Sequence, residues 1–229
     1  MIISHRHRFI FLKTRKTAGT SIETYLSAQC GDQDIVTPFG VEVAGHVARN
    51  AEGWFNPLPE LVANRRQWRH VLSQWSRHRK YRNHMPGYRV RGRISRRVWD
   101  GYFKFCVERN PWDKTLSHFH MERSRVGGDL EFDDYLAAKR FCIDHPIYTE
   151  PRDPQRLLVD RVVRYESLNE ELSDVFQQFG VSFDGSLGVR AKGGFRDDRR
   201  SYREVYTEAQ REIVAHAYRR EIALLGYTF

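Results

Sequence analysis

Two stretches of the sequence combine cations, hydroxyl groups and expected helix starts in a way that suits the binding of phosphate-like anions. The first stretch is Lys16-Thr17-Ala18-Gly19-Thr20-Ser21. It lies between the apolar run 9–12, typical of a buried strand, and apolar residues at helical spacing that begin at Ile22. A turn between a strand and a helix directs several backbone N–H groups and the positive end of the helix dipole to one place. Lys16 adds a mobile cation there, and Gly19 allows the backbone to approach an anion closely.

The second stretch is Arg109-Asn110-Pro111-Trp112-Asp113, followed by Ser117. Alternating apolar and polar residues from 103 to 108 predict a strand, and Asn110 followed by Pro111 predicts the start of a helix. Arg109 would then lie at the carboxyl end of a strand, where the ligands of open α/β sheets bind. Ser117 is about two helical turns beyond the cap. We therefore expect Arg109 and Ser117 to hold one phosphate group together.

The first stretch differs from the Walker A loop of nucleotide triphosphatases. That loop requires a Gly-Lys-Ser or Gly-Lys-Thr run, whereas here Lys16 precedes Gly19. A P-loop-like nucleotide kinase is therefore a disfavoured alternative.

Together the two stretches resemble the donor-binding motifs of sulfotransferases that use 3′-phosphoadenosine 5′-phosphosulfate (PAPS), in particular bacterial enzymes of the carbohydrate type. Residues 16–21 are similar to the 5′-phosphosulfate loop of that family. Residues 109–113 with Ser117 are similar to its 3′-phosphate motif, and the two follow in the family's order. The resemblance implies an enzyme that moves a sulfuryl group from PAPS, its co-substrate, to a hydroxyl or amine of an acceptor such as a glycan, a lipid or a small molecule. It implies no metal and no nucleic-acid partner.

The same family places a catalytic histidine, or another base, between its two donor motifs. His84 lies in that interval, and Asn83-His84-Met85-Pro86 is similar to the corresponding segment of bacterial members. The resemblance implies that His84 removes the acceptor proton and that Lys16 neutralises the charge on the bridging oxygen as the S–O bond breaks. Lys13 either adds to the phosphate-binding field or is solvated. His46 lies too far upstream to be the first choice of base.

Two later segments also resemble the family. Residues 165–168 are similar to its Tyr-Glu-x-Leu element, in which we interpret Glu166 as structural. The basic, glycine-rich residues 190–196 lie where the family has a loop over the 3′-phosphate and the adenine, although Ala191 interrupts the usual Arg-Lys-Gly sequence. Lys192 and Gly193 are candidate donor ligands by that resemblance, and a plain surface loop is the alternative.

The length of 229 residues fits one α/β domain, 1–229, with a sizeable core. We expect a mainly parallel sheet with helices on both faces, related to the P-loop nucleotide-binding architecture. No apolar run approaches the length of a membrane span, no secretory signal is visible at the start, and the three cysteines are widely spaced. These features predict a cytoplasmic protein.

The formal net charge of +9 favours anionic partners. The segment 61–99 contains no Asp or Glu and interleaves arginines with tryptophans. An anionic glycan or lipid headgroup would relieve this concentration of positive charge. Stacking of nucleobases on the tryptophans is the competing interpretation, which makes a basic single-stranded nucleic-acid-binding protein the second alternative function.

Overall fold

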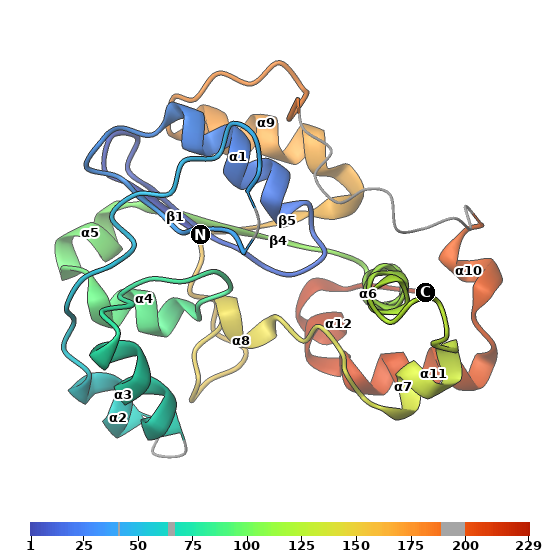
Figure 1. Ribbon diagram of the computed structural model, residues 1–229. Coiled ribbons are helices and arrows are strands. Elements are labelled where there is room, and N and C mark those ends of the chain that lie inside the picture. The colour runs from blue at the N-terminus through green and yellow to red at the C-terminus, as the bar shows by residue number, and fades with distance from the viewer. Residues whose placement is uncertain (41, 64–66, 189–199) are drawn as a thin grey trace.

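The fold is known from a computed structural model, which describes residues 1–40, 42–63, 67–188 and 200–229. Its sheet has five strands in the order β3-β1-β2-β4-β5 (Figure 1). The strands are β1 (Ile2–Ser4), β2 (Phe9–Leu12), β3 (Ile35–Val36), β4 (Phe103–Glu108) and β5 (Arg161–Arg164). Strands β2, β4 and β5 pair in parallel, whereas β1 pairs antiparallel with both β2 and β3.

The α/β class is thus confirmed, and the sheet is mixed. The antiparallel pair of β1 and β2 arises because the first twelve residues form a hairpin in which Ile2 lies opposite Phe11. Asp34 closes the turn of this hairpin, since its carboxylate accepts hydrogen bonds from the Ser4 hydroxyl at 2.8 Å and from the His5 amide at 2.6 Å. The parallel pairing is concentrated in the strands that carry the two predicted anion-binding motifs.

Helices cover both faces of the sheet, as the sequence predicts. Successive strand residues point to opposite faces, and each face has its own apolar cluster. Phe11 and Phe105 pack with α1 (Gly19–Gln29) and α9 (Leu168–Gln178) on one face. On the other face, Ile10 and Cys106 pack with α4 (Gly87–Arg93), α5 (Arg96–Gly101) and α8 (His145–Tyr148).

The remaining helices lie beside the sheet rather than on it (Figure 1). A third apolar cluster, which includes Trp112 and Tyr218, unites one group of them. That group is α6 (Pro111–Arg125), α7 (Phe132–Ala137), α10 (Tyr202–Val205), α11 (Glu208–Ala217) and α12 (Arg219–Leu225). On the opposite side of the view from this group lie α2 (Leu58–Ala63) and α3 (Trp68–Ser76). A short 3₁₀ helix, η2 (Tyr165–Ser167), directly precedes α9 in the sequence. Within the described ranges, every helix is too short or too polar to cross a bilayer.

The buried aromatic ring of Phe105 provides a test of this arrangement. Phe105 is fully buried and contacts the rings of Phe9, Phe11 and Phe176, so Phe105→Ala should lower the free energy of unfolding by about 3–5 kcal/mol. Phe103, two residues earlier on the same strand, is only half-buried, and Phe103→Ala should cost clearly less. Chemical denaturation measures both. Equal losses of unfolding free energy for the two variants would contradict the burial of Phe105 beneath α1 and α9.

Candidate active site

The first loop, residues 13–18, connects β2 to α1 and contains two residues with a left-handed backbone. Lys16 and Ala18 adopt left-handed conformations, with φ of 61° and 55°, which are uncommon for residues other than glycine. The Ala18 carbonyl accepts the hydrogen bond of the Ile22 amide at 3.1 Å, which begins α1. In α1, which the structure describes completely, Ala18 supplies no side-chain cap and the first turn holds no acidic residue. The amides at the helix start and the positive dipole end therefore suit an external anion.

Hydroxyl groups hold the first loop against the sheet. The Thr14 hydroxyl donates a hydrogen bond to the carbonyl of Val107 on the neighbouring strand β4. The Thr17 hydroxyl lies 2.8 Å from the Thr14 hydroxyl. Both threonines are buried. The Thr17 hydroxyl is therefore engaged inside the loop, whereas Thr20 is half-buried in the first turn of α1.

Lys13 is buried, so the alternative in which it is solvated is wrong. Its ammonium lies 2.8 Å from the Glu23 carboxylate and 4.0 Å from the centre of the Phe39 ring. The side chain passes close to the start of α1, since a Cβ atom at Gly19 would lie 2.9 Å from Lys13 Cγ and 3.3 Å from the Thr14 carbonyl oxygen. The absence of a side chain at Gly19 thus allows a close contact, and the group in contact is the side chain of Lys13.

The carboxylate of Glu23 is a buried anion behind the first loop. It accepts a hydrogen bond from the Met1 amino group at 2.6 Å, and His46 Nε2 lies 3.9 Å away. Burial opposes ionisation of Glu23, but Met1, His46 and Lys13 outweigh it and hold the pKa of this carboxyl well below its usual range. The positive charge of Lys13 is therefore balanced inside the protein.

Arg109 joins the two predicted motifs directly. Its Nη1 donates to the Lys16 carbonyl at 3.2 Å, while Nε and Nη2 lie 2.8 and 2.7 Å from the Asp113 carboxylate. The guanidinium also stacks over the Tyr165 ring, 4.2 Å from its centre, and the side chain is only 13% exposed. These contacts use three of the five N–H groups of the guanidinium.

The start of α6 forms as the sequence predicts and fixes Arg109. Asn110 is the N-cap, its side chain accepts from the Trp112 amide at 3.1 Å, and Pro111 takes the first helical position. The Glu166 carboxylate accepts a hydrogen bond from the Asn110 amide at 2.6 Å, which agrees with a structural role for Glu166. Ser117 follows Asp113 by four residues, so it lies one turn further along the same side of α6 and is half-buried.

His84 lies against the base of the first loop. Its Nδ1 is 3.1 Å from the Lys13 carbonyl, which can only accept a hydrogen bond, so Nδ1 carries the proton and Nε2 keeps its lone pair. Burial lowers the pKa of His84 to about 4, a shift that Asp144 opposes and Lys13 reinforces. His84 has a left-handed φ of 55°, which is uncommon for any non-glycine residue and marks a constrained position. A neutral imidazole with an available Nε2 can accept a proton.

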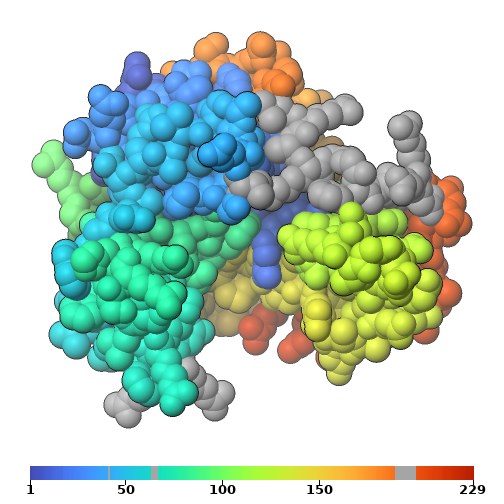
Figure 2. Space-filling view, viewed as in Figure 1, coloured from blue at the N-terminus to red at the C-terminus, as the bar shows by residue number. Residues whose placement is uncertain are grey.

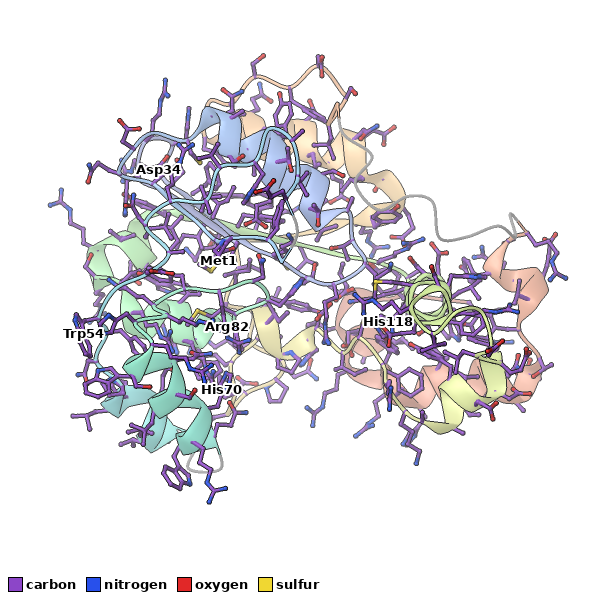
Figure 3. All side chains as sticks on the ribbon, in the orientation of Figure 1. Met1, Asp34, Trp54, His70, Arg82 and His118 are labelled. Atoms are coloured by element: carbon purple, nitrogen blue, oxygen red, sulfur yellow. The ribbon has the colours of Figure 1, made fainter. Side chains whose placement is uncertain are left out.

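A second histidine, His118, also lies close to the first loop and was not expected there. It follows Ser117 on α6, and Figure 3 shows it on the side of that helix nearer the centre of the view. Burial lowers the pKa of His118 to about 4, a change that Glu122 opposes and that the charges of Lys16 and Arg15 reinforce. The imidazole Nδ1 lies 2.8 Å from the Tyr135 hydroxyl. Nothing in the residues around His118 distinguishes it in the sequence from an ordinary helix residue.

A buried network of charges, which the sequence did not predict, lies beneath the first loop. The Lys114 ammonium lies 2.6 Å from Glu108 and 2.8 Å from Asp144, and all three side chains are at most 1% exposed. Asp144 in turn accepts hydrogen bonds at 2.7 Å from the backbone amide and from Nε of Arg15. Burial alone would lower the pKa of Lys114, but Asp144 and Glu108 raise it above its ordinary value. The network ties the first loop to α6.

The space-filling view shows a depression beside α6. In Figure 2, blue atoms from the N-terminal part of the chain lie in a depression between the green helical region on the left and yellow-green α6 on the right. A separate apolar groove of about 640 Å³ lies between residues 139–143 and α11, and Ile143, which lines it, accepts a hydrogen bond from Arg15 at 2.7 Å. Lys192 and Gly193, the candidate ligands of the later loop, lie outside the described residues.

Comparison with known proteins finds a relative of this chain. No family model matches the sequence, and no solved structure matches it. A protein of Archaeoglobus fulgidus, described as an uncharacterized protein, is 31% identical over 117 residues, which cover 49% of this chain and 98% of the archaeal protein. The chain belongs to the same family as that protein. Since the relative is uncharacterized, membership assigns no reaction.

The buried network predicts a large and local effect on stability. Lys114→Met leaves Glu108 and Asp144 buried together without their shared cation, so the free energy of unfolding should fall by about 3–5 kcal/mol. Arg96→Met is the matched control, because it also removes a cation from an ion pair but from a side chain that is 94% exposed. Thermal or chemical unfolding should show little change for Arg96→Met. Similar stabilities of the two variants would show that Lys114 does not bridge buried carboxylates.

Proposed function

We propose that the protein is a PAPS-dependent sulfotransferase whose β2–loop–α1 unit acts as a P-loop-like phosphosulfate site. The observation that carries the proposal is the hydrogen bond from Arg109 to the Lys16 carbonyl, which joins motifs 93 residues apart. The first loop and the β4–α6 junction follow adjacent parallel strands, so both lie at the same edge of the sheet. A nucleotide with phosphates at both ends would span the two.

The two junctions would hold different ends of the donor. The backbone N–H groups of residues 17–21 and the Lys16 ammonium would bind the 5′-phosphosulfate at the start of α1. The two N–H groups of Arg109 not used by Asp113 and Lys16, together with the Ser117 hydroxyl, would bind the 3′-phosphate. Charge-assisted hydrogen bonds of this kind contribute about 1.5–3 kcal/mol each. Lys13 would support the loop from behind, since Glu23 balances its charge.

The transfer step requires a nucleophile, a base and a stabilised leaving group. The acceptor oxygen or nitrogen forms a bond to sulfur while the bond from sulfur to the bridging phosphate oxygen breaks, and the electron pair stays on that oxygen. Lys16 would neutralise the charge that develops there. His84 Nε2 would take the acceptor proton, since Nδ1 is already committed to the Lys13 carbonyl. The products are the sulfated acceptor and 3′-phosphoadenosine 5′-phosphate.

Binding of the donor product tests the two anion pockets. Calorimetric titration with 3′-phosphoadenosine 5′-phosphate should give saturable one-site binding, and Arg109→Gln should weaken it by about tenfold or more, because the charged contacts to one phosphate are lost. Arg123→Gln, at the exposed far end of the same helix, is the control and should bind as the wild type does. Lys16→Ala should lose sulfuryl transfer yet still bind the product. An Arg109→Gln variant with wild-type affinity would refute the 3′-phosphate assignment.

The role of His84 is tested with a substitution that keeps its hydrogen bond. An asparagine amide can still donate to the Lys13 carbonyl but cannot act as a base, so His84→Asn should lower kcat by about 10²–10⁴-fold with little loss of donor binding. His78→Asn, at an exposed position, should leave kcat unchanged.

The pH profile gives an independent readout. A base works when deprotonated, and the pKa of His84 is about 4, so kcat/KM for the donor should stay level as pH falls through 6.5, the ordinary histidine pKa. The negative charge of the bound donor should raise the pKa of His84 in the complex. The acid limb of the pH profile of kcat should therefore lie at higher pH than the acid limb of the profile of kcat/KM. If the His84→Asn variant kept the acid limb in its pH profile of kcat, the base would be another residue.

A further inference from the structure

Exposed apolar side chains gather on one projecting part of the protein. Ten large apolar residues are exposed among those the structure describes, and seven of them fall between 47 and 75. Six of these seven lie on or beside α2 and α3, which form the lower left end of the molecule in Figure 1. We call them the α2–α3 patch, and its members are Trp54, Leu58, Val62, Trp68, Leu72 and Trp75.

On each of the two helices the patch members lie on one side. Leu58 and Val62 are one turn apart on α2, and the three members on α3 recur at i, i+4 and i+7. The adjoining side of α3 is in the interior, since Val71 is fully buried and Gln74 is 5% exposed. The patch members of α3 therefore lie next to the side through which this helix is already docked.

Aromatic contacts join the preceding loop to the helices. The Trp54 ring lies 5.0 Å from the Trp75 ring in an edge-on arrangement and 4.0 Å from the ring of His78. Figure 3 shows Trp54 at the outer left edge of the molecule, beside α3. Val62 and Trp54 are 74% and 58% exposed, so this surface leaves large apolar groups in water.

Positive charge surrounds the patch. The Arg69 guanidinium lies 5.5 Å from the centre of the Trp68 ring. Arg77 and Arg79 are exposed just beyond the end of α3. The sequence from 51 to 80 has two acidic residues, and one of them, Glu60, is buried against Arg93 at 2.5 Å. The surface is thus apolar at its centre and cationic at its rim.

We propose that the α2–α3 patch docks the protein onto the surface of an anionic lipid bilayer. Tryptophan and aliphatic side chains would enter the headgroup region while the arginines stay among the anionic headgroups, as in interfacial helices. Stacking of nucleobases or sugar rings would use the tryptophans but leave Leu58, Val62 and Leu72 without a partner. A bilayer interface accepts both kinds of side chain. The proposal is independent of sulfuryl transfer.

The tryptophans themselves report the docking. Three of the five tryptophans belong to the patch, whereas Trp99 and Trp112 are only 6% and 4% exposed. The 229-residue chain should therefore sediment together with phosphatidylglycerol vesicles, and its tryptophan emission should shift to shorter wavelength. Phosphatidylcholine vesicles should do so much less, and added salt should weaken the binding to anionic vesicles.

A matched pair of triple variants distinguishes binding through the patch from non-specific binding through other exposed apolar residues. The triple variant Leu58→Ser, Val62→Ser and Leu72→Ser should weaken binding to phosphatidylglycerol vesicles by about tenfold or more, because three apolar groups no longer insert. The control triple is Val126→Ser, Leu157→Ser and Ile213→Ser, which are similarly exposed elsewhere, and it should bind as the wild type does. All six positions are exposed, and thermal unfolding verifies that both variants fold.

Three results would overturn the proposal. The first is absence of vesicle binding by the wild type, and the second is equal binding by the two triple variants. The third is a tryptophan emission change with a single-stranded oligonucleotide or a sulfated glycan but none with anionic vesicles, which would assign the patch to that ligand instead.

Discussion

The contact between the Arg109 guanidinium and the Lys16 carbonyl is the constraint on which the candidate site depends. Arg109 is held at the end of β4 by the Asn110 cap and by Asp113, so its hydrogen bond positions the first loop relative to α6. The left-handed conformation of Lys16 places its carbonyl where this bond can form. The starts of α1 and α6 are thereby fixed at one edge of the sheet, an arrangement that would suit the proposed nucleotide with phosphates at both ends.

Buried charges make this arrangement rigid. Glu23 balances Lys13 behind the first loop, and Asp144 balances Lys114 and Arg15 below it. The ammonium groups of Lys13 and Lys114 each have a carboxylate oxygen within 3 Å, so these two buried cations add little uncompensated positive charge to the site. In the proposed function, the Lys16 ammonium and the start of α1 would meet the incoming phosphosulfate. Breaking either internal pair would leave a buried ion without its partner.

Local signals in the sequence predicted local structure well. The β4 strand, the Asn110 cap and Pro111 at the first helical position follow from short-range rules, and all are present. Long-range electrostatics was not predictable in the same way. Lys13 has the sequence context of a solvated lysine, and only the fold shows that Glu23 lies 2.8 Å from it. Asp144 gives no local sign that it is buried, because its partners come from the first loop and from α6.

The central claim is that two strand–helix junctions hold opposite ends of one adenine nucleotide. The most direct measurement is the affinity of the wild-type protein for three ligands under one set of conditions: 3′-phosphoadenosine 5′-phosphate, adenosine 5′-monophosphate and adenosine 3′-monophosphate. The account predicts that the bisphosphate binds about 10²-fold or more tightly than either monophosphate, because each junction contributes its own charge-assisted contacts. Equal dissociation constants for the three ligands would contradict it.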